Sequence, residues 1–250
     1  MANMEFLNRN LADTTTLFKV DSSTNAVKLL FDNNLAKRYL TDGYTTNTST
    51  IISVEFGSST VIDHIFLLNH NLKTYQIYYN SNAANSLYTA TSNSVSSQYI
   101  QFATTAVSSV QLKIDAAMTA DSERYIGEYW VSRELLSFER NPSIQNFNQR
   151  LDRKQVRHEM PDGGVILNNV KDKYKATVKL GYISKTFKDN LYTVFNMAAP
   201  MIFVAEPTTT SWNGEAYAVV WSGDFDFIYE ENSKTQGYGG KIVLEETPGG

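Results

Sequence analysis

The stretch DHIFLLNHNLKTYQIYYN, residues 63–80, joins an apolar run, a polar corner and an aromatic run. HIFLL is typical of a buried strand, and YQIYY, which is aromatic and β-branched, is typical of the next strand. Asparagine tolerates left-handed backbone angles and can hydrogen-bond its own turn, so Asn69 and Asn71 suit the connection. We expect His70 to be a turn residue that hydrogen-bonds nearby backbone, because no motif supplies a catalytic partner.

Short alternating segments of this kind recur along the chain. ISVEF (residues 52–56), VQLKID (110–115) and YKATVKL (174–180) alternate apolar and polar residues. Each segment can bury one face and leave the other in water. Several such segments, with little helical periodicity between them, predict antiparallel sandwich architecture.

Helical spacing is convincing only in SKTFKDNLYTVFNMAAP, residues 184–200. Ser184 is a suitable N-cap, and Pro200 ends the helix. We therefore expect one α-helix at about residues 184–198, packed against the strands around it. The side chains expected on its apolar face are Phe187, Leu191, Val194, Phe195 and Ala198.

A change of composition near residues 133–140 indicates a domain boundary. The chain becomes more charged there, and Pro142, Pro161 and the pair Gly163–Gly164 follow. We therefore expect a mainly β protein with two domains. The first, residues 1–135, is a β-sandwich, and the second, residues 136–250, is a β-barrel or sandwich with the packed helix.

Composition argues against several classes of function. Without cysteine the chain has no disulfide or thiolate chemistry, and the spacing of His64, His70 and His158 does not suggest a zinc site. We therefore expect no catalytic residue, no metal site and no cofactor. A net charge of −4 argues against general nucleic-acid binding. No apolar run approaches the roughly 20 residues of a membrane helix, and the start of the chain lacks the pattern of a secretory signal.

Charge is distributed unevenly along the second half. Residues 150–188 hold ten Lys/Arg against four Asp/Glu, whereas residues 224–250 hold six acidic residues against two lysines. This asymmetry is compatible with an ordinary solvated surface, and also with head-to-tail pairing of neighbouring subunits.

An ordered series of segments in the first half resembles the discoidin family, the galactose-binding-like jelly roll of coagulation-factor C domains and carbohydrate-binding modules. The segments are LLFDNNLAKRY (29–39), IISVEFGSSTVIDHIFLLNHN (51–71), YQIYYNSN, VQLKI and YIGEYWV (125–131). The resemblance implies a jelly roll whose loops hold a sugar or lipid, braced in some members by calcium. The positions that match the acidic calcium ligands are Asp32 and Glu128. Tyr39 and Tyr44 are the nearest aromatic candidates for a sugar site.

The second half is similar to the β-barrel domain of bacteriophage tail-tube and distal-tail proteins. The similarity rests on GGVILNNVKDKYKATVKLGYISKTFKDNLYTVF, PMIFVAEP and GYGGKIVLEE, which give strand, single helix and strands in that family's order. It implies a virion structural protein of a phage tail or tail tip, assembled in the host cytoplasm. The barrel would form a homo-oligomeric ring, with edge strands and the charged connection at residues 150–157 carrying subunit contacts. The jelly roll would contact other tail proteins or the host surface.

Two other functions are weighed against this structural role. The alternative is a carbohydrate-binding module protein that recognises glycans, including host-surface glycans, through the jelly-roll loops. The third is a glycosidase acting through two carboxylates, for which Asp224/Asp226 and Glu230/Glu231 are the available pairs. We expect those acids to face water while Phe225, Phe227 and Tyr229 point into the core, so an enzyme is the weakest of the three.

Overall fold

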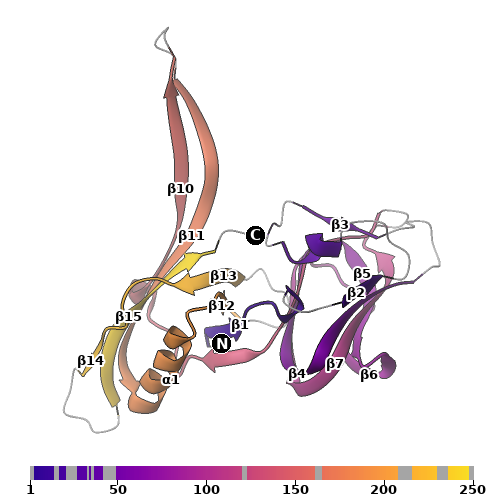
Figure 1. Cartoon of the computed structure of the whole chain (residues 1–250), viewed down its shortest axis with the longest axis horizontal. Coiled ribbons are helices and arrows are strands. Elements are labelled where there is room, and N and C mark those ends of the chain that lie inside the picture. The colour runs from indigo at the N-terminus through magenta and orange to yellow at the C-terminus, as the bar shows by residue number, and fades with distance from the viewer. Residues whose placement is uncertain are drawn as a thin grey trace.

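The computed structural model describes ten stretches of the chain, and the structural statements below concern these stretches alone. They are residues 3–13, 17–20, 27–32, 34, 37–41, 49–119, 123–160, 165–207, 216–229 and 236–247. Within them the protein is mainly β, with two antiparallel sheets and one α-helix, as the sequence predicted (Figure 1). No helix among them is long and apolar enough to span a membrane.

The first sheet has seven strands in the order β3-β8-β4-β7-β5-β6, with β2 paired to β4. Two short 3₁₀ helices, η1 (Leu11–Asp13) and η2 (Val27–Leu30), pack beside it. The strands are β2 (Leu17–Val20), β3 (Tyr39–Leu40), β4 (Thr50–His70), β5 (Leu72–Tyr79), β6 (Asn82–Ala90), β7 (Gln98–Ala117) and β8 (Tyr125–Ser132).

Two long strands, β4 and β7, run through the whole first sheet and curve around its core (Figure 1). Their pairing shifts register between Glu55 and Thr60 and again between Ile62 and His64. Such irregularities bend a sheet, so different parts of one strand can serve different faces of the core. Inward-facing residues of β4, β5, β7 and β8 fill that core, including Ile52, Val54 and Tyr129.

The second sheet has eight strands in the order β10-β11-β15-β13-β12-β1-β9, with β14 paired to β15. A 3₁₀ helix, η3 (Ile144–Asn146), precedes β10, and α1 (Lys185–Asn196) follows β11. The strands are β1 (Glu5–Asn8), β9 (Glu134–Ser137), β10 (Phe147–Glu159), β11 (Val165–Ser184), β12 (Met201–Val204), β13 (Ala216–Trp221), β14 (Phe227–Tyr229) and β15 (Gln236–Glu246).

The helix prediction is confirmed with a shorter carboxyl end. Ser184 is the N-cap, and its hydroxyl accepts the backbone N–H of Phe187 at 3.0 Å. Phe187, Leu191 and Val194 are buried, as their spacing indicated. Ala198 lies beyond the helix, exposed and with φ of +46°, because the helical backbone already ends at Asn196.

The first strand of the chain belongs to the second sheet. β1 lies between β9 and β12 and pairs with both, so residues 5–8 do not share a sheet with the seven strands that follow them. The predicted division into residues 1–135 and 136–250 therefore differs from the observed strand partners. The first sheet is inserted between β1 and β9, two strands that pair with each other.

A shared apolar cluster joins the two sheets, and we call it the interface cluster. It lies where β1 and β12 of the second sheet meet β4, β7 and β8 of the first. The cluster therefore packs side chains of both sheets against each other. The buried members are Leu7, Phe66, Leu68, Tyr99, Trp130, Ile202 and Val204.

A two-stranded ribbon, formed by β10 and the first part of β11, projects far from the second sheet (Figure 1). The strand β15 pairs with β11 only from Lys175 onward, so residues 165–174 of β11 pair with β10 alone. Ten residues of extended chain span about 30 Å. The segment at residues 150–157, expected as a charged connection, is therefore a strand of this ribbon.

Ile202→Ala tests whether the interface cluster couples the halves. Ile202 is 1% exposed, and truncating such a side chain costs about 2–5 kcal/mol of unfolding free energy. We expect calorimetry to show a single unfolding transition that moves to lower temperature as a whole. The exposed Ile228→Ala is the matched control and should change stability by less than about 0.5 kcal/mol. Two separate transitions, only one of them shifted, would contradict the coupling.

Candidate functional site

The corner at His70 has the structural role that the sequence predicted. His70 ends β4 and is fully buried, and its Nδ1 accepts the backbone N–H of Leu72 at 3.1 Å. Asn69 has the left-handed backbone expected of it, with φ of +49°. Burial lowers the pKa of His70 to about 4, so the ring is neutral near pH 7 and can accept this bond.

The two acidic residues suggested by the discoidin resemblance, Asp32 and Glu128, do lie together. Both carboxylates accept the backbone N–H of Asn34, at 3.0 Å for Asp32 and 2.7 Å for Glu128. Trp130 donates its indole N–H to the second oxygen of Glu128 at 3.0 Å, and Lys37 pairs with Asp32 at 3.3 Å. These contacts tie the early loop to β8 and already use oxygens that a calcium ion would need.

Glu128 is buried, not solvated as an ordinary strand residue would be. Burial raises the pKa of Glu128 to about 8, although the hydrogen bonds from Asn34 and Trp130 act in the opposite direction. Asp32 adds to the rise. The carboxyl therefore holds its proton over much of the pH range in which an exposed glutamate is ionised.

The sequence-based candidates for sugar binding and glycosidase chemistry find little support in the geometry. Tyr39 was expected near a sugar-binding loop, but it is completely buried in β3, because its ring is part of the first core. Tyr44 and the pair Glu230/Glu231 lie outside the described residues. Asp224 and Asp226 are exposed, as expected.

The aromatic residues between those acids follow the prediction in part. Phe225 and Phe227 pack against the second core, whereas Tyr229 is 46% exposed and does not point into it. The strand β14 begins only at Phe227, so the alternation expected from Asp224 onward is not that of a continuous strand.

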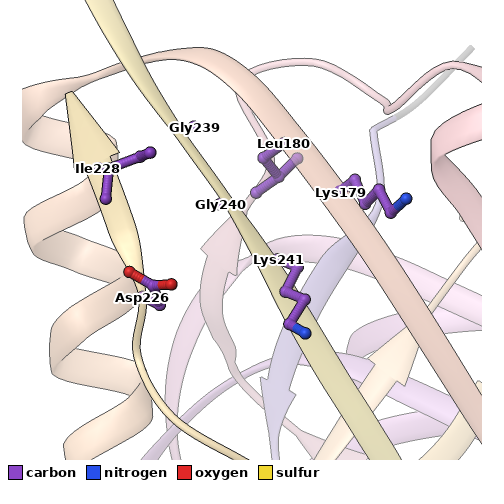
Figure 2. Close-up of a pocket in the computed structure, with 7 residues that line it drawn as sticks. All are labelled: Lys179, Leu180, Asp226, Ile228, Gly239, Gly240 and Lys241. Carbon is purple, nitrogen blue, oxygen red and sulfur yellow. The ribbon is translucent and has the colours of Figure 1, made fainter. Parts of the chain in front are cut away.

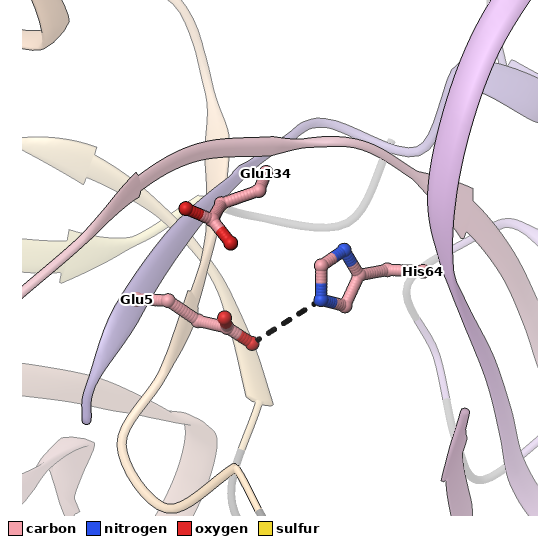
Figure 3. Close-up of side chains that lie close together, drawn as sticks. All are labelled: Glu5, His64 and Glu134. Atoms are coloured by element: carbon pink, nitrogen blue, oxygen red, sulfur yellow. Dashed lines mark ion pairs between the residues drawn. The ribbon is translucent and has the colours of Figure 1, made fainter. Parts of the chain in front are cut away.

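Sequence reasoning missed a polar cluster at the junction of the two sheets. Glu5 comes from β1, His64 from β4 and Glu134 from β9, and one ligand-type atom of each lies within 4.8 Å of the others (Figure 3). Glu5 is 3% exposed and His64 is fully buried, whereas Glu134 is half-buried. The positions are 59 and 70 residues apart, so no local motif could signal them.

Neighbouring side chains hold this cluster in place. Asp63 hydrogen-bonds to Nδ1 of His64 and also accepts the backbone N–H of Glu134 at 2.8 Å. Burial alone would raise the pKa of Asp63, but these bonds outweigh it and the pKa lies below its ordinary value. The hydroxyl of Tyr99 donates to Glu5. Burial raises the pKa of Glu5 despite this bond.

A pocket of 330 Å³ lies at another place, between β11, β14 and β15 (Figure 2). Lys179, Lys241 and Asp226 supply its charged groups, and all three are exposed. A Cβ at Gly240 would come within 2.5 Å of the carbonyl oxygen of Asp226, so glycine is needed where β14 approaches β15. The pocket contains no histidine and no pair of carboxylates, and its geometry does not indicate a reaction.

No family model and no curated protein matches this sequence. Among solved structures, half of the chain resembles CBM32 and related jelly-roll modules. Chitosan-binding module 1 of a chitosanase/glucanase from Paenibacillus sp. IK-5 is 19% identical with a TM-score of 0.42, over 50% of this chain and 98% of the module.

Two further structures show the same partial likeness. The Clostridium perfringens module CpGH89CBM32-5, solved with GalNAc-β-1,3-galactose, is 16% identical with a TM-score of 0.41, over 49% of this chain and 98% of the module. The Ruminococcus gnavus GH29 fucosidase is 16% identical with a TM-score of 0.43, over 52% of this chain and 27% of the fucosidase.

Glu128→Gln tests the buried carboxyl. Because the folded pKa lies above the unfolded one, the wild-type protein should lose stability as the pH rises from about 4.5 to about 8, by up to about 5 kcal/mol. Denaturant unfolding at a series of pH values should show this decline in the wild type and in the exposed control Glu123→Gln. The decline should be absent in Glu128→Gln, and an unchanged slope in that variant would contradict the raised pKa.

Proposed function

We propose that the protein is a non-enzymatic structural subunit that self-associates through the projecting ribbon. The observation that carries this proposal is the length of ribbon beyond the body of the second sheet, where each strand has only the other as its partner. A two-stranded hairpin is marginally stable in water, and it becomes stable when a further surface covers it. A neighbouring subunit is such a surface.

Exposed apolar side chains on the ribbon support the same proposal. Leu151 is 65% exposed, and Met160 and Val165, near the outer end, are 44% and 47% exposed. Contact with a neighbour would remove this apolar surface from water, which is the main favourable term in protein association. Exposed apolar residues and unpaired strand edges together are the features that assembly uses.

Several charged residues of the ribbon, among those whose side chains the structure describes, are paired within the chain. Arg150 lies 3.0 Å from Asp152, and Arg157 lies 2.9 Å from Glu159. Lys175 at the base pairs with Asp152 at 3.2 Å and with Glu245 at 3.0 Å. Exposed pairs of this kind contribute little energy. We therefore assign the subunit contact to the apolar residues. The charged residues would determine how neighbouring subunits are oriented.

The assembly we infer is a phage tail or tail tip, in which the second sheet forms a ring and the jelly roll faces outward. The support is the combination of a jelly-roll half, a second β unit with one packed helix, and a long ribbon able to reach a neighbour. In this proposal the protein is part of the virion, is assembled in the host cytoplasm, and has other tail proteins as its partners.

Glycan binding by the jelly-roll half is the second candidate. At the start of β8, the exposed Arg38 holds its guanidinium 4.2 Å above the ring of Tyr125. Sugar sites combine an aromatic face with a few polar groups. A glycan array probed with the full chain, and again with Tyr125→Ala, would reveal such a site as saturable binding that the substitution removes.

Leu151→Glu tests the assembly proposal. Because the side chain is exposed, the substitution should leave folding stability within about 0.5 kcal/mol of the wild type. A charge placed in a contact should weaken self-association at least tenfold, measured by sedimentation over a wide range of protein concentration. The control Met197→Glu alters an apolar residue that is 45% exposed but lies outside the ribbon, and it should associate as the wild type does. A wild type that stays monomeric at the highest concentration would refute the proposal.

A further inference from the structure

The cluster of Glu5, His64 and Glu134 brings two carboxylates together without a matching cation. Of the residues that the structure describes, no lysine or arginine forms an ion pair with either glutamate. Glu5 is nearly fully buried, and a buried carboxylate requires a positive partner or a proton. Among the described residues, the group that could supply a positive charge to Glu5 is the imidazole of His64, whose Nε2 lies 3.8 Å from Oε1 of Glu5.

The orientation of His64 indicates what its free nitrogen can do. Nδ1 is bonded to Asp63, an arrangement in which Nδ1 carries the proton and Nε2 presents a lone pair. Within the described part of the chain, Nε2 is buried and has no hydrogen-bond partner. It faces the two glutamates (Figure 3), so a lone pair points at carboxylate oxygens unless something positive lies between them.

We propose that Glu5, His64 and Glu134 bind one divalent transition-metal ion, with zinc as the ion that fits best. Imidazole nitrogen and carboxylate oxygen are ordinary zinc ligands, and ligand atoms around a tetrahedral zinc ion lie about 3.4 Å apart. The observed separations, 3.8 Å for Nε2 to Oε1 and 4.8 Å at most, need contractions of about 0.4 Å and at most about 1.4 Å. Asp63 then acts as the outer carboxylate that fixes the histidine ring, a common partner of zinc-bound histidine.

This site is a structural cross-link between the two sheets. Glu5 and Glu134 lie on the paired strands β1 and β9, and His64 lies on β4 of the inserted sheet. A bound ion would therefore fasten the inserted sheet beside the two points at which the chain enters and leaves it. Because Glu134 is only half-buried, the ion and its water ligand can reach the site from solvent.

Calorimetric titration of the full chain with zinc, after dialysis against EDTA and then chelator-free buffer, tests the proposal. We expect one zinc ion per chain and a rise in the unfolding temperature on zinc addition. Glu134→Gln and His64→Gln should each weaken binding at least about tenfold and abolish the thermal shift. Asp63→Asn should weaken it about 10–100-fold, because the ring of His64 loses its partner.

The exposed histidine in the ribbon provides the matched control. His158→Gln removes a potential surface ligand far from the cluster and should bind zinc as tightly as the wild type. No binding by the wild type, or equal binding by the wild type and Glu134→Gln, would overturn the proposal. Glu134→Gln alters a half-buried side chain, so it gives a result even if His64→Gln does not fold. The outcome is independent of the assembly proposal, because the ribbon plays no part in it.

Discussion

The pairing of β1 with β9 and β12 is the constraint on which the rest of the architecture depends. It closes the second sheet around the two points where the chain leaves for the first sheet and returns from it. Two consequences follow from this insertion. Leu7 joins Phe66 in the interface cluster, and Glu5 is brought close to His64. The relative position of the halves is thus fixed by two backbone connections, an apolar contact and a buried polar one, instead of by a single linker.

The ribbon contrasts with this well-supported body. Many residues of β4 and β7 lie in the first core, and β12 is buried along its whole length, whereas the outer part of β11 pairs only with β10. The structure thus combines strands that the two cores cover with about 30 Å of paired strand that extends into solvent. That distribution is what an assembly subunit needs, because the rigid body sets the geometry and the exposed element makes the contact.

Local sequence patterns predicted local structure, but they did not predict which residues far apart in the chain become partners. The buried run at residues 64–68, the alternation of residues 174–180 and the N-cap at Ser184 all follow from spacing along a few residues. The partner strands of β1 do not follow from such spacing, because a four-residue strand is too short to indicate which sheet it joins. Asp32 and Glu128 were paired only through a family resemblance. The same resemblance placed Tyr39 near a sugar site, whereas its ring belongs to the first core. Glu5, His64 and Glu134 are brought together by the strand topology, which the spacing of residues along the sequence does not reveal.

Hydrogen exchange followed by mass spectrometry at low and high protein concentration tests the central claim most directly, namely that the body is self-sufficient and the ribbon is completed by a neighbour. The account predicts that the amides of β1, β4 and β12 are protected equally at both concentrations. The amides of residues 152–159 and 165–173 should exchange rapidly in dilute solution and become protected as subunits associate. Ribbon amides that are already as slow as those of β4 in the dilute monomer, or that stay fast in the assembled state, would contradict it.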